Sequence, residues 1–140
     1  MKYLLDTCVI SELIKKKPEK KVVSWISEIR EKHLFLSVFT IGEIYKGICK
    51  LPEGKKKIKL LNWLNVTLNK RFKNRILDFD IPIAKKWGEI QGHSELMGKP
   101  ISIIDSLISA TAIVYNIVLV TINTRDMEYS GAILLNPWEL

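Results

Sequence analysis

The chain has 140 residues, of which 47% are apolar, so it can form one full hydrophobic core and is too short for several. We therefore expect residues 1–140 to form a single domain. The formal charge is +7, and it is uneven: residues 1–75 hold 18 Lys and Arg against 7 Asp and Glu, whereas residues 76–140 hold 4 against 8. The basic half favours a polyanionic partner such as nucleic acid, although a solvated lysine surface has the same composition.

Cysteine usage and hydropathy indicate a cytoplasmic protein. Cys8 and Cys49 lack the Cys-x-x-Cys spacing of a zinc site, and so few cysteines are typical of a reducing compartment. Only three apolar residues lie between Lys2 and Asp6, too few for a signal peptide. Residues 100–122 carry one formal charge and could span a bilayer by length. Their polar residues favour a buried helix and a buried strand instead, so we expect no membrane contact.

The first dozen residues predict a strand that leads directly into a helix. Tyr3–Leu5 is a short apolar run, and apolar residues then recur at helical spacing from Val9 to Ile14. Asp6 lies between the two, at the carboxyl end of the strand, which is the edge where open α/β sheets bind ligands. Alternatively, Asp6 only caps the helix.

The rest of the basic half predicts helices around a second strand. Leu34–Leu36 is a short buried strand, and Ser37–Leu51 returns to helical period with Glu43 about two turns inside it. Pro18 suits the first turn of an earlier helix. Residues 55–68 form a basic amphipathic helix. Its polar side carries Lys55, Lys56, Lys57 and Lys59. This side either contacts phosphates or is simply solvated.

The acidic half continues the alternation of strands and helices. We expect a weak strand at residues 75–79, followed by a helix from Asp80 with His93 in its polar tail. An apolar helix is expected at residues 100–115, and Asn116 ends it. A central strand at residues 118–121, a loop at residues 123–126 and a last strand at residues 133–135 complete the chain. His33 and His93 have no second ligand nearby and suit the surface. The pattern predicts an α/β fold: a mostly parallel sheet of about five strands flanked by helices.

Four acids map to the predicted carboxyl edge of this sheet: Asp6, Glu43, Asp105 and Asp126. Asp105 lies among apolar residues with no Lys or Arg within a turn, and an unpaired buried carboxylate is costly. A cation would compensate its charge. Each acid also has a structural alternative, because Glu43 and Asp105 fit capping boxes with Thr40 and Ser102, and Asp126 fits a turn.

Clustered carboxylates without thiol or imidazole ligands select hard cations, Mg²⁺ or Mn²⁺, over zinc. Such a site serves phosphoryl chemistry, because bound metals lower the pKa of a water and stabilise the attacking and leaving oxygens. The basic half of the chain would then hold the nucleic-acid backbone.

Four segments carry a family resemblance: YLLDTCVISEL at the start, SVFTIGEIYKGI around Glu43, PISIIDSLISATA around Asp105, and LVTINTRDM with GAILLNPW at the end. Through them the chain resembles the PIN-domain ribonucleases, specifically the VapC-type toxins of toxin–antitoxin pairs, along nearly its whole length. The resemblance implies that Asp6, Glu43, Asp105 and Asp126 are catalytic, metal-binding acids. It also implies supporting roles for Thr7, Thr121 and Asn123 in orienting ligands or water.

The resemblance further implies an Mg²⁺- or Mn²⁺-dependent endoribonuclease that inhibits translation as a homodimer. Its partners would be RNA, an antitoxin that occludes the site, and operator DNA bound through the antitoxin. Three positions depart from the family pattern. Cys8 replaces a common Asn, Ile122 a frequent Arg, and Met127 a frequent aromatic residue. No acid is lost, but the missing Arg leaves the substrate contacts open.

Other folds with acids at a sheet edge fit less well. A receiver domain normally has a Lys after its last strand, where this chain has Asn136 and Pro137. A haloacid-dehalogenase-type phosphatase requires an Asp-x-Asp motif after its first strand, but position 8 is Cys. A dinucleotide-binding domain needs a Gly-rich first turn, and residues 6–12 contain no Gly. The alternative function is a catalytically inactive nucleic-acid- or partner-binding module of the same fold.

Overall fold

The computed structural model describes residues 1–140, and its centre is a five-stranded sheet in which all neighbouring strands are parallel. The strands are β1 (Tyr3–Leu5), β2 (Leu34–Ser37), β3 (Ile76–Leu77), β4 (Val118–Val120) and β5 (Leu134–Leu135). Their order across the sheet is β3-β2-β1-β4-β5. The parallel sheet predicted from the sequence is therefore confirmed.

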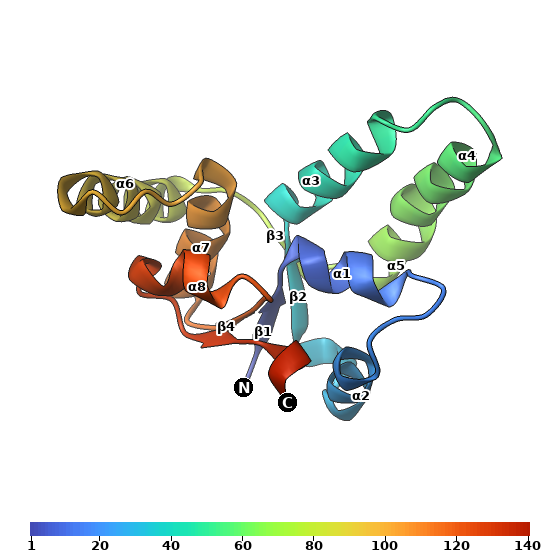
Figure 1. The fold of residues 1–140 in the computed structure, drawn as a ribbon, viewed down its shortest axis with the longest axis horizontal. Helices are drawn as coiled ribbons and strands as arrows, with labels where there is room; N and C mark the ends of the chain where they lie inside the picture. Colours follow the sequence, from blue (N-terminus) through green and yellow to red (C-terminus); the bar gives the residue numbers. More distant parts are fainter.

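Helices connect the strands and extend away from the sheet as two pairs, α3 with α4 and α6 with α7 (Figure 1). The helices are α1 (Thr7–Leu13), α2 (Lys20–Glu28), α3 (Val38–Cys49), α4 (Lys55–Asn62), α5 (Asn69–Arg71), α6 (Ile81–Met97), α7 (Ile103–Tyr115) and α8 (Thr124–Met127). Shorter helical turns are η1 (Glu31–His33), the π-helical segment η2 (Trp63–Leu68), η3 (Glu128–Ser130) and η4 (Pro137–Glu139).

Several predicted boundaries were wrong. The strand expected at residues 75–79 is only Ile76–Leu77, and the helix expected from residue 100 begins at Ile103. The basic helix does not end at Leu68, because α4 passes through η2 into α5 and reaches Arg71. The second helix begins at Lys20, so Pro18 precedes it instead of forming its first turn. The loop expected at residues 123–126 is largely the short helix α8, which buries Met127 completely against the core beside α7.

The two faces of the sheet bury different residues, because side chains alternate along a strand. Leu5 and Val120 pack on one face with residues of α1 to α4 and η2, whereas Leu4 and Leu119 pack on the other with residues of α7 and α8. All four are fully buried. Helices thus cover both faces of the sheet, as expected for parallel strands. No helix combines the length and the apolar character needed to cross a membrane.

The strand order reverses at β1, and this reversal defines the ligand-binding edge. The chain runs from β1 to β2 and β3 on one side, and then to β4 and β5 on the other. In open α/β sheets, ligands bind at the carboxyl ends of the two strands that flank such a switch point. Leu5 pairs with Val120 across β1 and β4, so Asp6 and Thr121 follow side by side at this edge.

Candidate active site

Asp6 is the buried centre of the site, with only 3% of its surface exposed. Its Oδ1 accepts a 2.8 Å hydrogen bond from the Thr7 backbone N–H, and its Oδ2 accepts a 2.7 Å bond from the Thr121 hydroxyl. Asp6 therefore does cap α1, but the cap uses only one of its two oxygens. Burial raises the pKa of Asp6, the two hydrogen bonds lower it, and the charges of Asp105 and Glu43 raise it further.

Glu43 reaches the site from the middle of α3. Its Oε1 accepts a 2.6 Å hydrogen bond from the Thr7 hydroxyl, which orients the carboxylate across a gap of 36 residues in sequence. The capping-box alternative for Glu43 is wrong, because α3 begins at Val38 and its N-cap is Ser37. Ser37 accepts a hydrogen bond from the Phe39 N–H, so the cap needs no help from Glu43.

Asp105 lies in the first turn of α7, where Ser102 is the N-cap and accepts a 3.1 Å hydrogen bond from the Asp105 N–H. The expectation that this segment is fully buried was wrong at its start. Asp105 is half-buried and Ile103 is 63% exposed, because the first turn of α7 projects at the sheet edge. Burial raises the pKa of the Asp105 carboxyl, the side chain of Ser102 beside that carboxyl lowers it, and the charge of Asp126 raises it. No basic side chain forms an ion pair with Asp105.

Asp126 is exposed on α8, where it follows β4 by way of Thr121 and Asn123. The Asn123 N–H donates a 3.0 Å hydrogen bond to the Thr121 hydroxyl oxygen. The Thr121 hydroxyl thus joins Asp6 to the segment that leads to Asp126. Because Asp126 is part of a helix, its alternative as a turn residue is not supported.

Cys8 contributes a thiol to this network. The sequence alone had indicated no role for this residue. Its Sγ lies 3.8 Å from Asp6 Oδ2 and 3.7 Å from Thr121 Oγ1, and it accepts a 3.5 Å hydrogen bond from the Ile122 N–H. Burial raises the pKa of the Cys8 thiol to about 11, and the charge of Asp6 adds to this effect. At neutral pH the thiol is therefore a neutral group beside Asp6.

The four acids form a chain of neighbouring charges. Asp6 interacts with Glu43 and Asp105, and Asp105 interacts with Asp126. No three acidic, histidine or cysteine side chains converge closely enough to enclose one metal ion. The donors are carboxylate and hydroxyl oxygens, the ligand type that Mg²⁺ and Mn²⁺ prefer. The chemistry of the set therefore fits a hard cation, although the side chains do not yet surround one.

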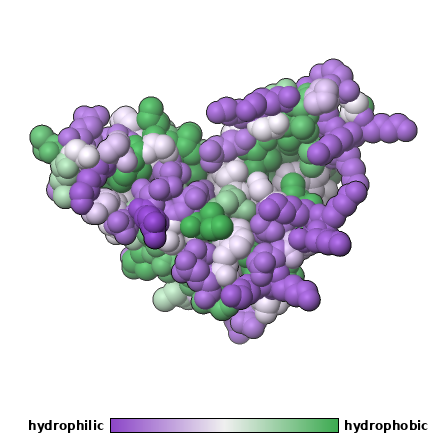
Figure 2. Space-filling view, in the orientation of Figure 1, coloured by the Kyte–Doolittle hydropathy of each residue, from purple (hydrophilic) through white to green (hydrophobic).

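The basic surface lies beside this edge, on the lobe formed by α3 and α4. Exposed lysines on and between these helices are Lys46, Lys50, Lys55, Lys56 and Lys59. Long hydrophilic side chains project from this lobe in Figure 2. Lys57 differs from the others, because its ammonium group forms a 2.8 Å ion pair with Glu53.

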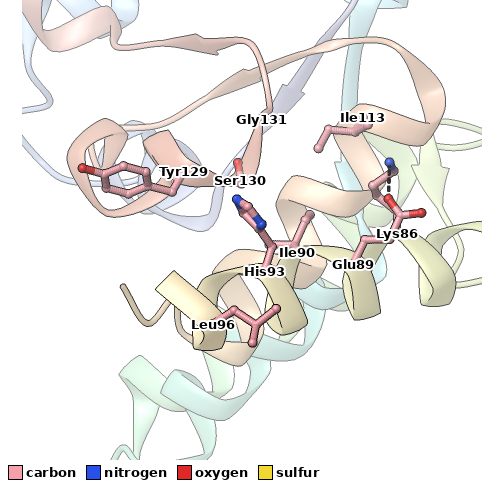
Figure 3. Close-up of a pocket in the computed structure, with 9 residues that line it drawn as sticks. All are labelled: Lys86, Glu89, Ile90, His93, Leu96, Ile113, Tyr129, Ser130 and Gly131. Atoms are coloured by element: carbon pink, nitrogen blue, oxygen red, sulfur yellow. Dashed lines mark hydrogen bonds and ion pairs between the residues drawn. The ribbon is translucent and has the colours of Figure 1, made fainter. Parts of the chain in front are cut away.

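One cavity lies away from these acids. It has a volume of about 540 Å³ and lies between α6, α7 and η3. His93 points toward Ser130 across it, and Lys86 pairs with Glu89 at its edge (Figure 3). None of the four acids lines it. We therefore place the candidate active site at the sheet edge, where the titratable groups gather.

Comparison with known proteins identifies the family. The PIN domain family matches residues 3–129. The chain is 32% identical to VapC ribonuclease Y4jK of Sinorhizobium fredii, with 97% of each chain covered, and 34% identical to toxin FitB of Neisseria gonorrhoeae, covering 96% and 97%.

Solved structures agree with this assignment. The structure of FitAB bound to an IR36 DNA fragment superposes with a TM-score of 0.92 at 33% identity, covering 99% of this chain and 96% of that one. VapBC2 from Rickettsia felis, bound to a DNA fragment from its promoter, gives a TM-score of 0.79 at 28% identity, covering 97% and 98%. The chain therefore belongs to the PIN domain family and, within it, to the VapC-type toxins.

Proposed function

We propose that this chain is a Mg²⁺- or Mn²⁺-dependent endoribonuclease, the toxin of a toxin–antitoxin pair that inhibits translation by cleaving RNA. The observation that carries the proposal is Asp6, a buried carboxylate at the switch point of the sheet that interacts with Glu43 and Asp105. A carboxylate in this position is costly without a cation. The ribonuclease activity named for the relative Y4jK supports the same chemistry.

Asp6, Glu43, Asp105 and Asp126 would hold the metal. Asp6 follows β1, Glu43 and Asp105 lie on α3 and α7, and Asp126 lies on α8. The bound cation would lower the pKa of a water and stabilise negative charge on the phosphate. Repulsion among the carboxylates would fall as the ion binds, which favours binding.

The chain's own groups would position these acids during the reaction. The Thr121 hydroxyl holds one oxygen of Asp6, and the Thr7 hydroxyl holds one oxygen of Glu43. Each carboxylate keeps lone pairs free for a cation. Asn123 is the N-cap residue of α8, the helix that carries Asp126, and its amide would orient water or substrate. The lysines of α3 and α4 would hold the RNA phosphates beside the acids.

We also propose the partners and the setting. An antitoxin would occlude the acids, and the toxin–antitoxin complex would bind operator DNA, as the VapBC2 complex binds promoter DNA. Exposed apolar residues on the α6 and α7 side, such as Ile81, Leu96 and Ile103, are consistent with a homodimer. The two free cysteines are consistent with the cytoplasm. Residues 1–140 would act as one nuclease domain.

The test is cleavage of purified tRNA and rRNA by the chain, with Mg²⁺, with Mn²⁺ and with EDTA. Asp105→Asn removes a charge with little change in volume, so it should abolish cleavage and leave the protein folded. Asp78→Asn is the matched control, because Asp78 is exposed in the connection between β3 and α6. Cleavage that persists in EDTA would exclude the metal, and cleavage by Asp105→Asn would exclude this site.

A further inference from the structure

A second cavity opens beside the acids. It has a volume of about 230 Å³ and lies between α1, α3 and the segment formed by α4 and η2. The hydrogen-bonded pair Thr7 and Glu43 forms part of its wall. Buried Ile44 and Ile48 form its apolar floor. Figure 2 shows apolar surface in the hollow between α3 and α4, framed by hydrophilic side chains.

An aromatic side chain and a local helix irregularity meet at this cavity. Trp63 lines it, and Trp63 is also the first residue of the π-helical segment η2. π-helical turns are less stable than α-helical ones and occur frequently at functional sites. The π-helical segment therefore begins at the same residue, Trp63, whose side chain lines the cavity.

Apart from Glu43, the charged side chain that lines the cavity is basic, which favours an anionic occupant. Lys56 lines it directly and is exposed, and Lys55 and Lys59 lie on the same helix. Lys46 and Lys50 extend the basic surface along α3 and beyond its end. A ligand with an apolar planar part and a phosphate would match the apolar floor, the indole and the ammonium groups together.

We infer that this cavity binds one unpaired nucleobase of the RNA substrate, next to the phosphate that is cleaved. The inference rests on the proposed ribonuclease function, because Glu43 would connect the cavity to the reacting phosphate. Unpaired bases stack on aromatic side chains, while basic residues follow the backbone. The volume is below the range of about 300–1,000 Å³ that is typical for drug-sized ligands, and it suits a single ring system.

This occupant implies a class of substrate. A base inside a duplex is stacked and paired, so it would have to leave the helix to enter the cavity. Single-stranded loops and ends present such bases without this cost. The cavity therefore favours cleavage in single-stranded regions of a structured RNA over cleavage within a duplex.

Gly47 offers a substitution that fills the cavity without crowding the fold. It lines the cavity, it is exposed on α3 one turn after Glu43, and a Cβ added there would meet nothing within 4 Å. Side chains on a helix lean toward its N-terminus, so a ring at this position would cover the Glu43 turn. Gly42 is the matched control, because it is also exposed on α3 with free space at its Cβ, yet it does not line the cavity.

The experiment uses a short single-stranded RNA that the wild-type protein cuts at one position, and versions in which each flanking nucleotide in turn is abasic. With wild type, one abasic position should lower kcat/KM by about five- to 150-fold, the range expected for the loss of one base–aromatic stack. Gly47→Phe should lose a similar factor on the intact RNA, and the abasic change should then cost nothing more. Gly42→Phe should behave as wild type.

The outcomes separate this inference from the proposed function. If wild type cuts no RNA with Mg²⁺ or Mn²⁺, the proposed function fails. If wild type cuts RNA but no abasic position matters, the nucleobase site is excluded, whatever the variants do. The inference also fails if Gly47→Phe cuts intact RNA normally but no longer binds the antitoxin, because the cavity is then a protein-binding site. The rise in melting temperature with Mn²⁺ should be equal in Gly47→Phe and wild type, which shows that the acids are intact.

Discussion

Thr121 donates its hydroxyl hydrogen to Asp6 Oδ2 over 2.7 Å, a bond between residues 115 positions apart in the chain. The parallel register of β1 and β4 places the two residues next to each other, and both are almost fully buried. A hydrogen bond to a buried carboxylate stabilises its charged form. Thr121 therefore makes it possible for an anionic Asp6 to be kept inside the protein.

Replacing Thr121 by Val should remove this donor at nearly constant volume. The Asp6 carboxylate would lose a partner inside the protein, so the free energy of unfolding at neutral pH should fall by about 1–3 kcal/mol without metal. Urea denaturation measures the change. Thr121→Ser should restore most of the loss, and Thr67→Val, at an exposed position, should be nearly neutral. Equal stability of Thr121→Val and wild type would mean that Asp6 is not charged in the folded protein.

The pH dependence of stability should reveal the acids whose charged form is destabilised in the folded protein. The pKa values of Asp6 and Asp105 are raised above the ordinary value of 3.8, so the folded state binds more protons than the unfolded state between that value and the raised one. Stability of the metal-free protein should therefore decrease as the pH rises through this window, and increase as the pH falls from neutral toward 3.8.

Asp6→Asn isolates the contribution of Asp6 to this curve. Asn can still accept from the Thr7 N–H and can donate to the Thr121 oxygen, so the cap should survive. The variant should melt higher than wild type in EDTA at neutral pH, and the difference should shrink toward pH 4. If the melting temperatures of the two proteins change with pH in parallel across this range, the charge of Asp6 does not destabilise the folded protein.

The edge at which the acids gather could be predicted from the sequence. The strand and helix periodicities show where each strand ends, and therefore which acids follow its carboxyl end. Asp6 illustrates this: an apolar run too short for a helix must be a strand, and Asp6 ends it. The same reasoning placed Glu43 and Asp126 after the second strand and the central strand. The order of the strands across the sheet was beyond this reasoning, because pairing is a long-range property.

The contacts inside the site could not be predicted for the same reason. Thr7 bonds to Glu43 through a side-chain geometry that no spacing rule encodes. Asp105 lies within an apolar pattern, but the pattern cannot tell that the first turn of α7 projects into solvent. The helix α8 was missed because a four-residue helix has too little periodicity to be recognised, although its Met127 is buried in the core.

The hydroxyl of Thr7 should orient Glu43 for catalysis. Thr7→Val removes the 2.6 Å hydrogen bond while keeping the shape of the side chain, so Glu43 gains freedom to rotate. We expect kcat on RNA to fall about tenfold or more, as for other lost positioning contacts, with a smaller change in KM. Thr7→Ser should recover most of the rate. Steady-state kinetics with saturating Mn²⁺ measure this split, and an unchanged kcat for Thr7→Val would assign the bond a purely structural role.

The lysines of α4 should control how RNA affinity depends on salt. Each phosphate that they neutralise contributes a slope of about −0.7 in log K against log salt for a single strand. Replacing the exposed Lys55, Lys56 and Lys59 by Ser should flatten the slope in proportion. Lys57→Ser should have less effect, because Lys57 is already paired with Glu53. Binding of an uncleaved RNA in EDTA, followed by fluorescence anisotropy, gives the slopes. An unchanged slope in the triple variant would move the contact to another basic segment, such as Lys15–Lys17.

Metal binding should reverse the instability that the acids create. Mg²⁺ or Mn²⁺ would bind only the folded arrangement of Asp6, Glu43, Asp105 and Asp126, so it should stabilise the fold by mass action. At a hundredfold excess of metal over the dissociation constant the gain is about 2.7 kcal/mol, which a thermal melt detects as a higher Tm. Asp6→Asn should have a higher Tm than wild type without metal, because one source of repulsion among the carboxylates is gone. Its Tm should rise much less with Mn²⁺, because one charged ligand is missing. The exposed control Asp78→Asn should match wild type in both respects. If Asp6 served only as a helix cap, Asn would replace it without loss and Mn²⁺ would shift neither protein, so coincident melting curves would count against a metal site at Asp6.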